Sequence, residues 1–292
     1  MSQEFRLGID IGASKTALVV IDNNNKVVAG DRFPTHEFYD NWFLEVDQHI
    51  QTIQKNYPLK TIGIGIAGQV DSQGVLLHAP NLGWNQLPLA EIFSRHYEVP
   101  TMMLNDVRAA AWAEWHLGAG KGHQNFVVMM IGTGIGGALI AGGQLITGNN
   151  HSAGELGHMI VGGSGPRCSC GNEGCLEAQS GGWAIAERYG AENAADVISH
   201  YKKGDKKAAK IIDDVYEGLL RGCLTIVHAF NPELILLGGG IIEALPDIPQ
   251  WLKENIEEKA LKAASKNLKI KRIELGEGAV AIGSAHYANA KM

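Results

Sequence analysis

The chain has 292 residues, of which 45% are hydrophobic and 19% are charged, and its net charge is -6. This length exceeds the usual size of one hydrophobic core, so we expect two lobes. The negative charge argues against nucleic acid as the main partner. The sequence has no apolar run long enough to span a membrane, and its N-terminus lacks the pattern of a signal peptide. We therefore expect a reducing, cytoplasmic setting.

The first part of the chain alternates between expected strands and expected helices. Strands are predicted over 6–10, 16–21, 27–33, 61–68 and 99–104, and helices over 37–56, 87–97 and 106–118. An Asn-rich turn at 22–26 between two β-branched runs is typical of a hairpin. Asp106 is expected to be the N-cap of the helix that it begins.

The stretch GIGIAG, residues 63–68, matches a dinucleotide-binding pattern. Its first glycines alternate with isoleucine, so they lie within the strand, and no helix follows at the required place. We therefore reject a dinucleotide site. Gly68, at the strand exit, is better explained by a close approach of the backbone to a ligand.

Residues 125–145 begin a second cycle that resembles the first hairpin: a strand, a Gly-rich turn with a hydroxyl residue, and a strand. Helices are expected over 178–203 and 205–230, a strand over 234–238, a further helix, a strand over 271–275 and a helix over 278–290. The pattern predicts an α/β protein with mixed sheets. We expect a small lobe over 1–118, completed by a returning helix at about 278–292, and a large lobe over 119–277.

Three of the four cysteines gather in the stretch CSCGNEGC, residues 168–175. In a reducing compartment, thiols at this spacing are more typical of a metal site than of a disulfide. Zinc requires four ligands, and His158 in the stretch GELGHM can join Cys168, Cys170 and Cys175. The alternative is that these cysteines only pack, as Cys223 is expected to do. We predict a structural zinc loop.

Two glycine-rich turns are candidates for binding phosphate, because backbone N–H groups in such turns form anion-binding nests. In GIDIGASKT the candidates are Asp10, Gly12, Ser14, Lys15 and Thr16. In IGTGIGG they are Thr133 and Gly134, and Gly239 in LLGGGI is a further candidate for contact with the nucleotide. A carboxylate beside phosphate suits Mg²⁺, which makes Asp10 the candidate for that ion. The alternative is a pair of tight hairpins with solvated side chains.

Polar residues at junctions between elements are the candidates for chemistry. Asn105 and Asp106 end a strand and begin a helix, although a plain helix cap would also explain Asp106. Glu155 and His158 are three residues apart, so one helical turn presents both on one face, and Glu177 follows the last cysteine of the zinc loop. Carboxylates, an Asn and a His that converge suit a ligand with several hydroxyl groups.

The chain resembles the ROK family of bacterial sugar kinases and repressors, within the actin/hexokinase/Hsp70 ATPase superfamily. The resemblance extends over nearly the whole chain and rests on GIDIGASKT, GIGIAGQVD, PNLGW, LNDVRAAAWAE, IGTGIGG, AGELGHM, CSCGNEGCLEAQSG and LGGGI. It implies an actin-like, ribonuclease H-like fold of two lobes that close on a sugar and ATP. It also implies Mg²⁺ bound with ATP, and a homodimer.

The same resemblance implies roles for individual residues. Asp106 is the general base, and Asp10 handles the metal, indirectly. The residues implied to contact the sugar, besides Asp106, are Gly68, Asn81, Asn105, Glu155, His158 and Glu177. The zinc ligands match the four expected above, so His158 would serve both metal and sugar.

Two positions depart from the family pattern. The family usually has D-I-G-G-T-K where this chain has DIGASK, and a left-handed backbone at Ala13 would cost about 1 kcal/mol relative to glycine. Ser14 keeps the hydroxyl group of the usual threonine. Where N-D-A-N is common, this chain has NDVR, which places Arg108 on the helix beside the cleft without an assigned role.

These features favour an ATP-dependent kinase that acts on the 6-hydroxyl of a hexose. Glucose is the first candidate, because related N-acetylmannosamine kinases often have His where this chain has Glu155; N-acetylmannosamine, N-acetylglucosamine, mannose and fructose stay open. A repressor of the family would need a helix-turn-helix domain before the first strand, for which we expect no room. Asp106 and Asp10 argue against a non-catalytic sugar sensor. Four filled zinc positions argue against a zinc hydrolase.

Overall fold

The computed structural model describes residues 4–162 and 165–291, and the chain divides into two compact units. Unit 1 is formed by Met1–Lys121, Thr147–Ala153 and Leu275–Met292, and unit 2 by Gly122–Ile146 and Gly154–Glu274. The first unit therefore extends to Lys121 rather than to residue 118. The short stretch Thr147–Ala153, which we expected in the large lobe, belongs to unit 1.

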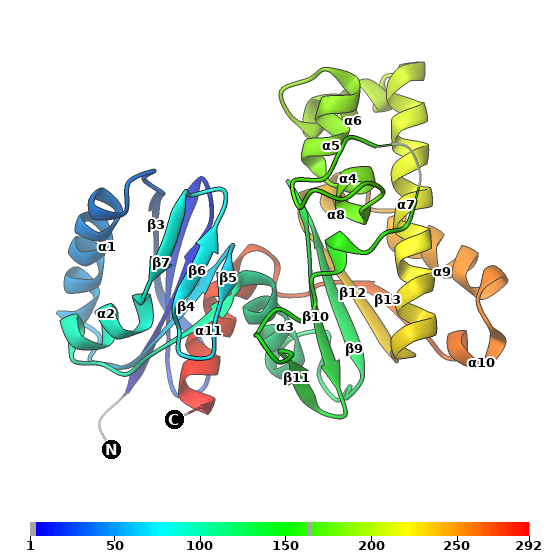
Figure 1. Ribbon diagram of the computed structural model, residues 1–292. Coiled ribbons are helices and arrows are strands. Elements are labelled where there is room, and N and C mark those ends of the chain that lie inside the picture. The colour runs from blue at the N-terminus through cyan, green and yellow to red at the C-terminus, as the bar shows by residue number, and fades with distance from the viewer. Residues whose placement is uncertain (1–3, 163–164, 292) are drawn as a thin grey trace. The chain divides into compact units, whose positions relative to one another are not determined.

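Unit 1 is built on a five-stranded sheet with the order β3-β2-β1-β4-β8 (Figure 1). Its strands are β1 (Phe5–Ile11), β2 (Lys15–Ile21), β3 (Val27–Pro34), β4 (Leu59–Ile66) and β8 (Thr101–Asn105). The first three strands are antiparallel neighbours, whereas β4 and β8 run parallel to β1. The carboxyl ends of β1, β4 and β8 therefore meet at one edge of this sheet.

The helices of unit 1 cover both faces of this sheet. They are α1 (Tyr39–Gln54), α2 (Leu89–Tyr97), α3 (Asp106–Leu117) and α11 (Ala279–Ala290), the last preceded by a 3₁₀ turn at Gly276–Gly278. The core on one face combines residues of α1 and α2 with alternate residues of β1 and β4. Helix α11 packs on β1, β4 and α3 (Figure 1).

The alternation of isoleucine and glycine in β4 reflects these two faces, because successive side chains of a strand point to opposite sides. Its isoleucines are fully buried in the core with α1 and α2. A Cβ on Gly63 would lie 1.9 Å from the carbonyl oxygen of Ser284 in α11. The residues that resemble a dinucleotide motif are thus a packing pattern that lets α11 approach the sheet.

A second, smaller sheet in unit 1 was not expected from the sequence. It has three short strands in the order β5-β6-β7. They are β5 (Gln69–Val70), β6 (Leu76–Ala79) and β7 (Trp84–Leu87). Asn81 lies in the turn between β6 and β7.

Unit 2 repeats the sheet of unit 1, with the strand order β11-β10-β9-β12-β13 (Figure 1). Its strands are β9 (Phe126–Ile131), β10 (Ile135–Ala141), β11 (Gln144–Ile146), β12 (Leu234–Gly238) and β13 (Lys269–Arg272). The first three are antiparallel neighbours, and β12 runs parallel to both β9 and β13. The internal repeat predicted from the two glycine-rich hairpins is confirmed, while the last strand ends earlier than expected.

Unit 2 contains short helices and one long helix. They are α4 (Leu176–Ser180), α5 (Gly182–Tyr189), α6 (Ala194–Lys202), α7 (Lys206–Phe230), α8 (Gly240–Ala244), α9 (Ile248–Lys259) and α10 (Lys262–Ser265), with a 3₁₀ turn at Leu156–His158. The single helix expected over 178–203 is therefore three helices. Of the helices of unit 2, α4, α8 and α9 contact its sheet. Gly190, with φ of 82°, ends α5 in the left-handed region that favours glycine. Within the described residues, no helix is long and apolar enough to cross a membrane.

Candidate active site

The carboxyl edge of the first sheet brings Asp10, Asn105 and Asp106 together in unit 1. Asp10 pairs with Gly65 in the parallel register, and Ile66 pairs with Asn105. Since the three strands end at nearly the same level, polar residues far apart in the sequence lie at one edge. Ligands of open α/β sheets bind outside such carboxyl ends.

Asn105 fixes the geometry of this edge. Its side-chain oxygen accepts hydrogen bonds from the backbone N–H groups of Val107 (3.1 Å) and Arg108 (3.3 Å), and its amide donates to the carbonyl oxygen of Gly68 (3.3 Å). Asn105 is therefore the N-cap of α3, which corrects the expectation that Asp106 has this role. Asp106 is the first residue of the helix, and its carboxylate accepts from the N–H of Val107 at 2.9 Å.

Asp10 is a buried carboxyl group close to a second one. Burial raises the pKa of Asp10 to about 7, and the negative charge of Asp106 acts in the same direction. Lys15 opposes this shift, but its Nζ lies 3.0 Å from Oε2 of the exposed Glu277. Two neighbouring carboxyl groups at a buried edge favour a bound cation, and oxygen ligands suit Mg²⁺.

The turn between β1 and β2 contains the other residues expected to bind phosphate. The N–H of Gly12 donates to the carbonyl oxygen of Lys15 at 3.0 Å, and Ser14 is exposed. Ala13 is not in the left-handed region, so the cost anticipated for that position does not arise. Thr16 is fully buried, and its hydroxyl interacts with Thr35 (2.8 Å) and accepts from the indole N–H of Trp42 (2.8 Å). Thr16 therefore belongs to the core of unit 1.

Gly68 lies at the same edge of unit 1, where its carbonyl oxygen accepts from Asn105. A Cβ on Gly68 would lie 2.8 Å from the carbonyl oxygen of His78, so the neighbouring strand β6 already requires glycine there. The protein's own backbone thus explains this glycine, and contact of Gly68 with a ligand stays a prediction. Asn81 is exposed in the turn between β6 and β7.

In unit 2, the turn between β9 and β10 holds Glu177. The N–H of Ile135 donates to Oε2 of Glu177 at 2.7 Å, and the indole N–H of Trp183 donates to Oε1 at 3.3 Å. A Cβ on Gly134 would lie 2.3 Å from Oε2, so glycine admits the carboxylate. The backbone N–H of Trp183 donates to the carbonyl oxygen of Thr133 at 2.9 Å. Glu177 and the glycine-rich turn therefore form one packed assembly.

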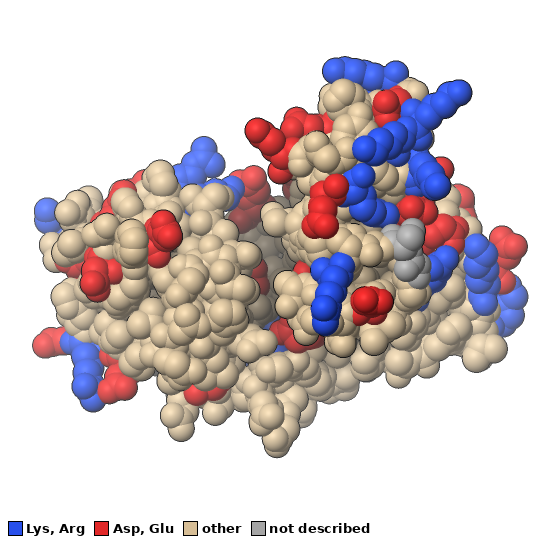
Figure 2. Space-filling model, turned by 45° about the horizontal axis from the view of Figure 1, so that its top comes forward, with Lys and Arg blue, Asp and Glu red and all other residues tan. Residues whose placement is uncertain are grey.

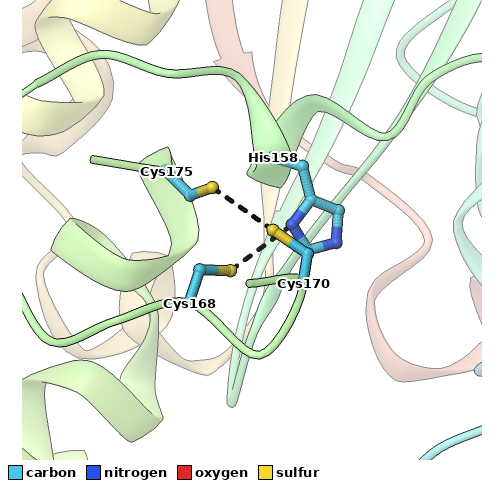
Figure 3. Close-up of side chains that lie close together, drawn as sticks. All are labelled: His158, Cys168, Cys170 and Cys175. Atoms are coloured by element: carbon cyan, nitrogen blue, oxygen red, sulfur yellow. Dashed lines mark hydrogen bonds between the residues drawn. The ribbon is translucent and has the colours of Figure 1, made fainter. Parts of the chain in front are cut away.

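The four predicted zinc ligands converge in unit 2 (Figure 3). The ligand atoms of His158, Cys168, Cys170 and Cys175 all lie within 4.8 Å of one another. Cys170 Sγ lies 3.6 Å from Cys175 Sγ, and Cys168 Sγ lies 3.6 Å from Nδ1 of His158. Thiolates bound to zinc at about 2.3 Å lie about 3.8 Å apart in a tetrahedron. The residues present therefore fit a structural zinc ion.

The thiol chemistry agrees with this fit. A hydrogen bond from the backbone of Asn172 lowers the pKa of Cys170 to about 7, whereas burial raises the pKa of Cys175 to about 12. A buried thiolate needs a compensating cation, which a zinc ion supplies. The turn expected before Cys168 includes residues 163–164, which lie outside the described residues.

The cluster also orients residues expected to bind sugar. His158 faces the sulfur atoms through Nδ1 (Figure 3), which leaves Nε2 as the other nitrogen of the ring. Glu155 is exposed and precedes the 3₁₀ turn that carries His158, and the N–H of His158 donates to the carbonyl oxygen of Glu155 at 3.1 Å. Helix α4 begins directly after Cys175, which places Glu177 in its first turn.

A cavity of about 530 Å³ lies in unit 2, beside the glycine-rich turn. Its volume is in the range of small-molecule sites. It is lined by Gly132, Thr133, Gly182, Trp183, Ala186, Glu192, Asn193, Ala194, Ala195, Ile198, Gly240, Ile241 and Ala244. Sequence reasoning found Thr133 but missed the contributions of α5 and α6, because no single motif unites them. Gly240 lines the cavity rather than Gly239, whose Cβ would lie 2.4 Å from the carbonyl oxygen of Ile131.

Comparison with known proteins yields concordant matches. A glucokinase from Halalkalibacterium halodurans is 28% identical over 97% of this chain and 94% of its own length. A xylose repressor from Bacillus subtilis is 27% identical over 96% of this chain and 75% of the repressor. The crystal structure of a ROK hexokinase from Thermus thermophilus matches with a TM-score of 0.83 and 26% identity, over 98% of this chain and 99% of that one. The expected α/β fold of two sheets is confirmed. The family model described as "ROK family" matches residues 6–291, and the chain belongs to the ROK family.

Proposed function

We propose that this protein is an ATP-dependent kinase that transfers the γ-phosphoryl group of ATP to the 6-hydroxyl of a hexose, with glucose as the preferred hexose. The observation that carries the proposal is Asp106 at the first residue of α3, beside the buried Asp10. Matched relatives that are named glucokinase and hexokinase support it.

Asp106 is the general base of the proposed reaction. Its carboxylate takes the proton of the 6-hydroxyl as the sugar oxygen attacks the γ-phosphorus in line. The new O6–P bond forms while the bond from the γ-phosphorus to the bridging oxygen breaks, and ADP leaves with that oxygen. Asn105 supports this step by capping α3, which fixes the backbone that carries Asp106.

The proposed nucleotide site is the cavity of unit 2. Its apolar lining from α5, α6 and α8 suits a flat base, while Thr133 and Gly134 lie in the turn that would bind phosphate. In unit 1, Gly12, Ser14 and Lys15 are the proposed phosphate contacts; we leave the buried Thr16 out of this set. Mg²⁺ bound with ATP would neutralise charge on the phosphates, with Asp10 as its partner in unit 1.

The proposed sugar ligands are Asn81, Asn105, Gly68, Glu155, His158 and Glu177. If Nδ1 of His158 binds zinc, the neutral ring carries its proton on Nε2 and can donate to a sugar oxygen. Because α4 starts directly after Cys175, the zinc loop would also hold Glu177 in place. Zinc is thus proposed as a structural ion that orients sugar-binding residues.

A sugar-responsive regulator is the second candidate, because a xylose repressor matches 96% of this chain. On the face shown in Figure 2, Lys and Arg side chains are interspersed with Asp and Glu instead of forming one basic surface. Asp106 and Asp10 together favour catalysis. We further propose a homodimer, on the family resemblance, and a cytoplasmic location, which keeps the three cysteine ligands reduced.

The test is an assay of ADP release with glucose, mannose, fructose, N-acetylmannosamine and N-acetylglucosamine. We expect the highest kcat/KM with glucose, a lower value with 2-deoxyglucose, and still lower values with both N-acetylhexosamines. A site that pairs with a hydroxyl rejects analogues that lack it, because its polar groups are left unpaired. A kcat/KM for N-acetylmannosamine above that for glucose would overturn the choice of glucose. If no sugar led to ADP release, the proposal of kinase activity would be overturned.

A further inference from the structure

Helix α3 carries two buried charged residues that the proposed reaction does not use. Arg108 is 3% exposed and Glu114 is fully buried. Burying a charged group is costly unless it is hydrogen-bonded or paired, so both residues require a reason. Hydrogen bonds connect both residues to segments of unit 1 by which the chain passes between the two units.

Arg108 holds the segment Thr147–Ala153. Its guanidinium donates to the carbonyl oxygens of His151 (2.7 Å) and Ala153 (2.8 Å). His151 has a φ of 53°, a left-handed conformation that costs a residue other than glycine about 1 kcal/mol or more. The two hydrogen bonds therefore fix a strained stretch of backbone, and Glu155 follows it two residues after Ala153.

Glu114 holds the other two connecting segments. Its Oε1 accepts from the backbone N–H of Leu275 and its Oε2 from that of Ala119, each at 2.8 Å. A Cβ on Gly118 would lie 2.3 Å from Oε2, so glycine at this position makes room for the carboxylate. One carboxylate thus joins residues that are more than 150 positions apart in the sequence.

We propose that Arg108 and Glu114 are positioning residues that fix the three connecting segments of the described chain onto the helix that begins with Asp106. The consequence for catalysis rests on the proposed function: Arg108 sets the position of the backbone that leads into Glu155, a proposed sugar ligand. The fixing of the segments themselves does not depend on any activity.

The first test is Arg108→Lys, which keeps the charge but loses the fork that spans two carbonyl oxygens. Hydrogen exchange without ligands should be about tenfold faster in residues 147–155, the effect of losing one hydrogen bond to a charged group. The KM for the sugar should rise about tenfold, while the KM for ATP changes less than about twofold.

Arg188→Lys is the matched control. Arg188 lies in unit 2 and donates to the carbonyl oxygens of Gln179 (2.6 Å) and Ala184 (3.3 Å), away from the connecting segments. It should lower the Tm comparably but leave exchange in residues 147–155 unchanged. Unchanged exchange in Arg108→Lys, or an equal increase in both variants, would overturn the proposal.

Glu114→Gln tests the second anchor independently. Glutamine offers one acceptor oxygen where two N–H groups point, so exchange should rise at Ala119 or Leu275 while residues 147–155 stay unchanged. No change at either amide would overturn the role of Glu114. If the wild-type protein phosphorylates no sugar, the exchange experiments still decide the positioning proposal, since they need no substrate.

Discussion

The two sheets share one strand order but differ at their carboxyl ends. In unit 1, β1 and β8 end in the acidic and amide groups of Asp10, Asn105 and Asp106. In unit 2, β9 has the place of β1 and leads into the glycine-rich turn, and β12 has the place of β4 and is followed by Gly239 and Gly240. The duplicated scaffold therefore carries acidic and amide side chains at its strand ends in unit 1 and glycines in unit 2, where Glu177 of α4 packs against the turn.

This difference separates two chemical tasks. Carboxylates can accept a proton and attract a cation, whereas glycines let a ligand approach backbone N–H groups without an intervening Cβ. A buried carboxylate has an energetic cost: burial disfavours the charged form of Asp10 and raises its pKa. In unit 2 the residues of the turn itself are uncharged, and the carboxylate of Glu177 beside them accepts hydrogen bonds from Ile135 and Trp183.

The largest effect is expected from Asp106→Asn, which removes the proposed base from the acidic edge. The kcat should fall about 10²–10⁴-fold, while sugar binding measured by calorimetry changes little. Asp71→Asn is the control, because its carboxylate accepts hydrogen bonds from the N–H groups of its own turn, those of Gln73 and Val75. Retention of a tenth of the wild-type turnover would contradict the assignment of Asp106.

Substitutions of the glycines after β12 should act through the backbone and not through a lost charge. Gly239 has a φ of 94°, and an added Cβ would lie 2.4 Å from the carbonyl oxygen of Ile131, so Gly239→Ala should lower the free energy of unfolding by about 2–4 kcal/mol. Gly240 has open space around the equivalent position and lines the cavity. Gly240→Ala should therefore leave the Tm unchanged but raise the KM for ATP. Equal Tm values for both variants in thermal unfolding would show that the backbone constraint is absent.

The prediction of a zinc site concerns unit 2 alone. Elemental analysis should find about one zinc ion per chain, and Cys170→Ser should remove it because one of four ligands is lost. Cys223→Ser is the control, since Cys223 is buried in α7 outside the cluster. Loss of zinc should weaken sugar binding more than ATP binding. Normal sugar binding by the metal-free variant would mean that the cysteines only pack.

The smallest expected effect is the pH dependence of thermal stability that Asp10 of unit 1 causes. The pKa of Asp10 is raised to about 7 in the folded protein. The stability that its neutral form contributes is therefore complete below the pKa of Asp10 in the unfolded chain, and it is lost as the pH rises through 7. Asp10→Asn keeps the side chain neutral, so at pH 8.5 its Tm should exceed that of the wild type by about 3 °C or more. The difference should narrow towards pH 5. Parallel Tm curves between pH 5 and 8.5 would contradict the elevated pKa.

Local patterns made much of the fold predictable. The two glycine-rich hairpins and most strands follow from alternating β-branched residues and turn signals. The cluster of four candidate metal ligands could be found because three of them lie within eight residues and thiols have few alternative roles in a reducing setting.

Features that depend on tertiary contacts were missed. Asn105 and Asp106 are both good helix caps, and the pairing of Asn105 with Ile66 decides which of them caps α3. The cavity of unit 2 combines four segments, and those from α5 and α6 have no distinctive sequence. Arg108 and His151 are 43 positions apart, and nothing in either stretch predicts their hydrogen bond.

The close fit of α11 against β1 and β4 has a consequence for biosynthesis. Unit 1 needs residues up to Lys121 and again from Leu275, with roughly 150 residues of chain between them. At a translation rate of 5–20 residues per second, the glycine-lined face of its sheet stays uncovered for about 8–30 s before α11 is synthesised. Unit 2 is nearly complete on the ribosome before that helix emerges. The nascent first sheet is therefore the part of this protein most exposed to aggregation and to capture by chaperones.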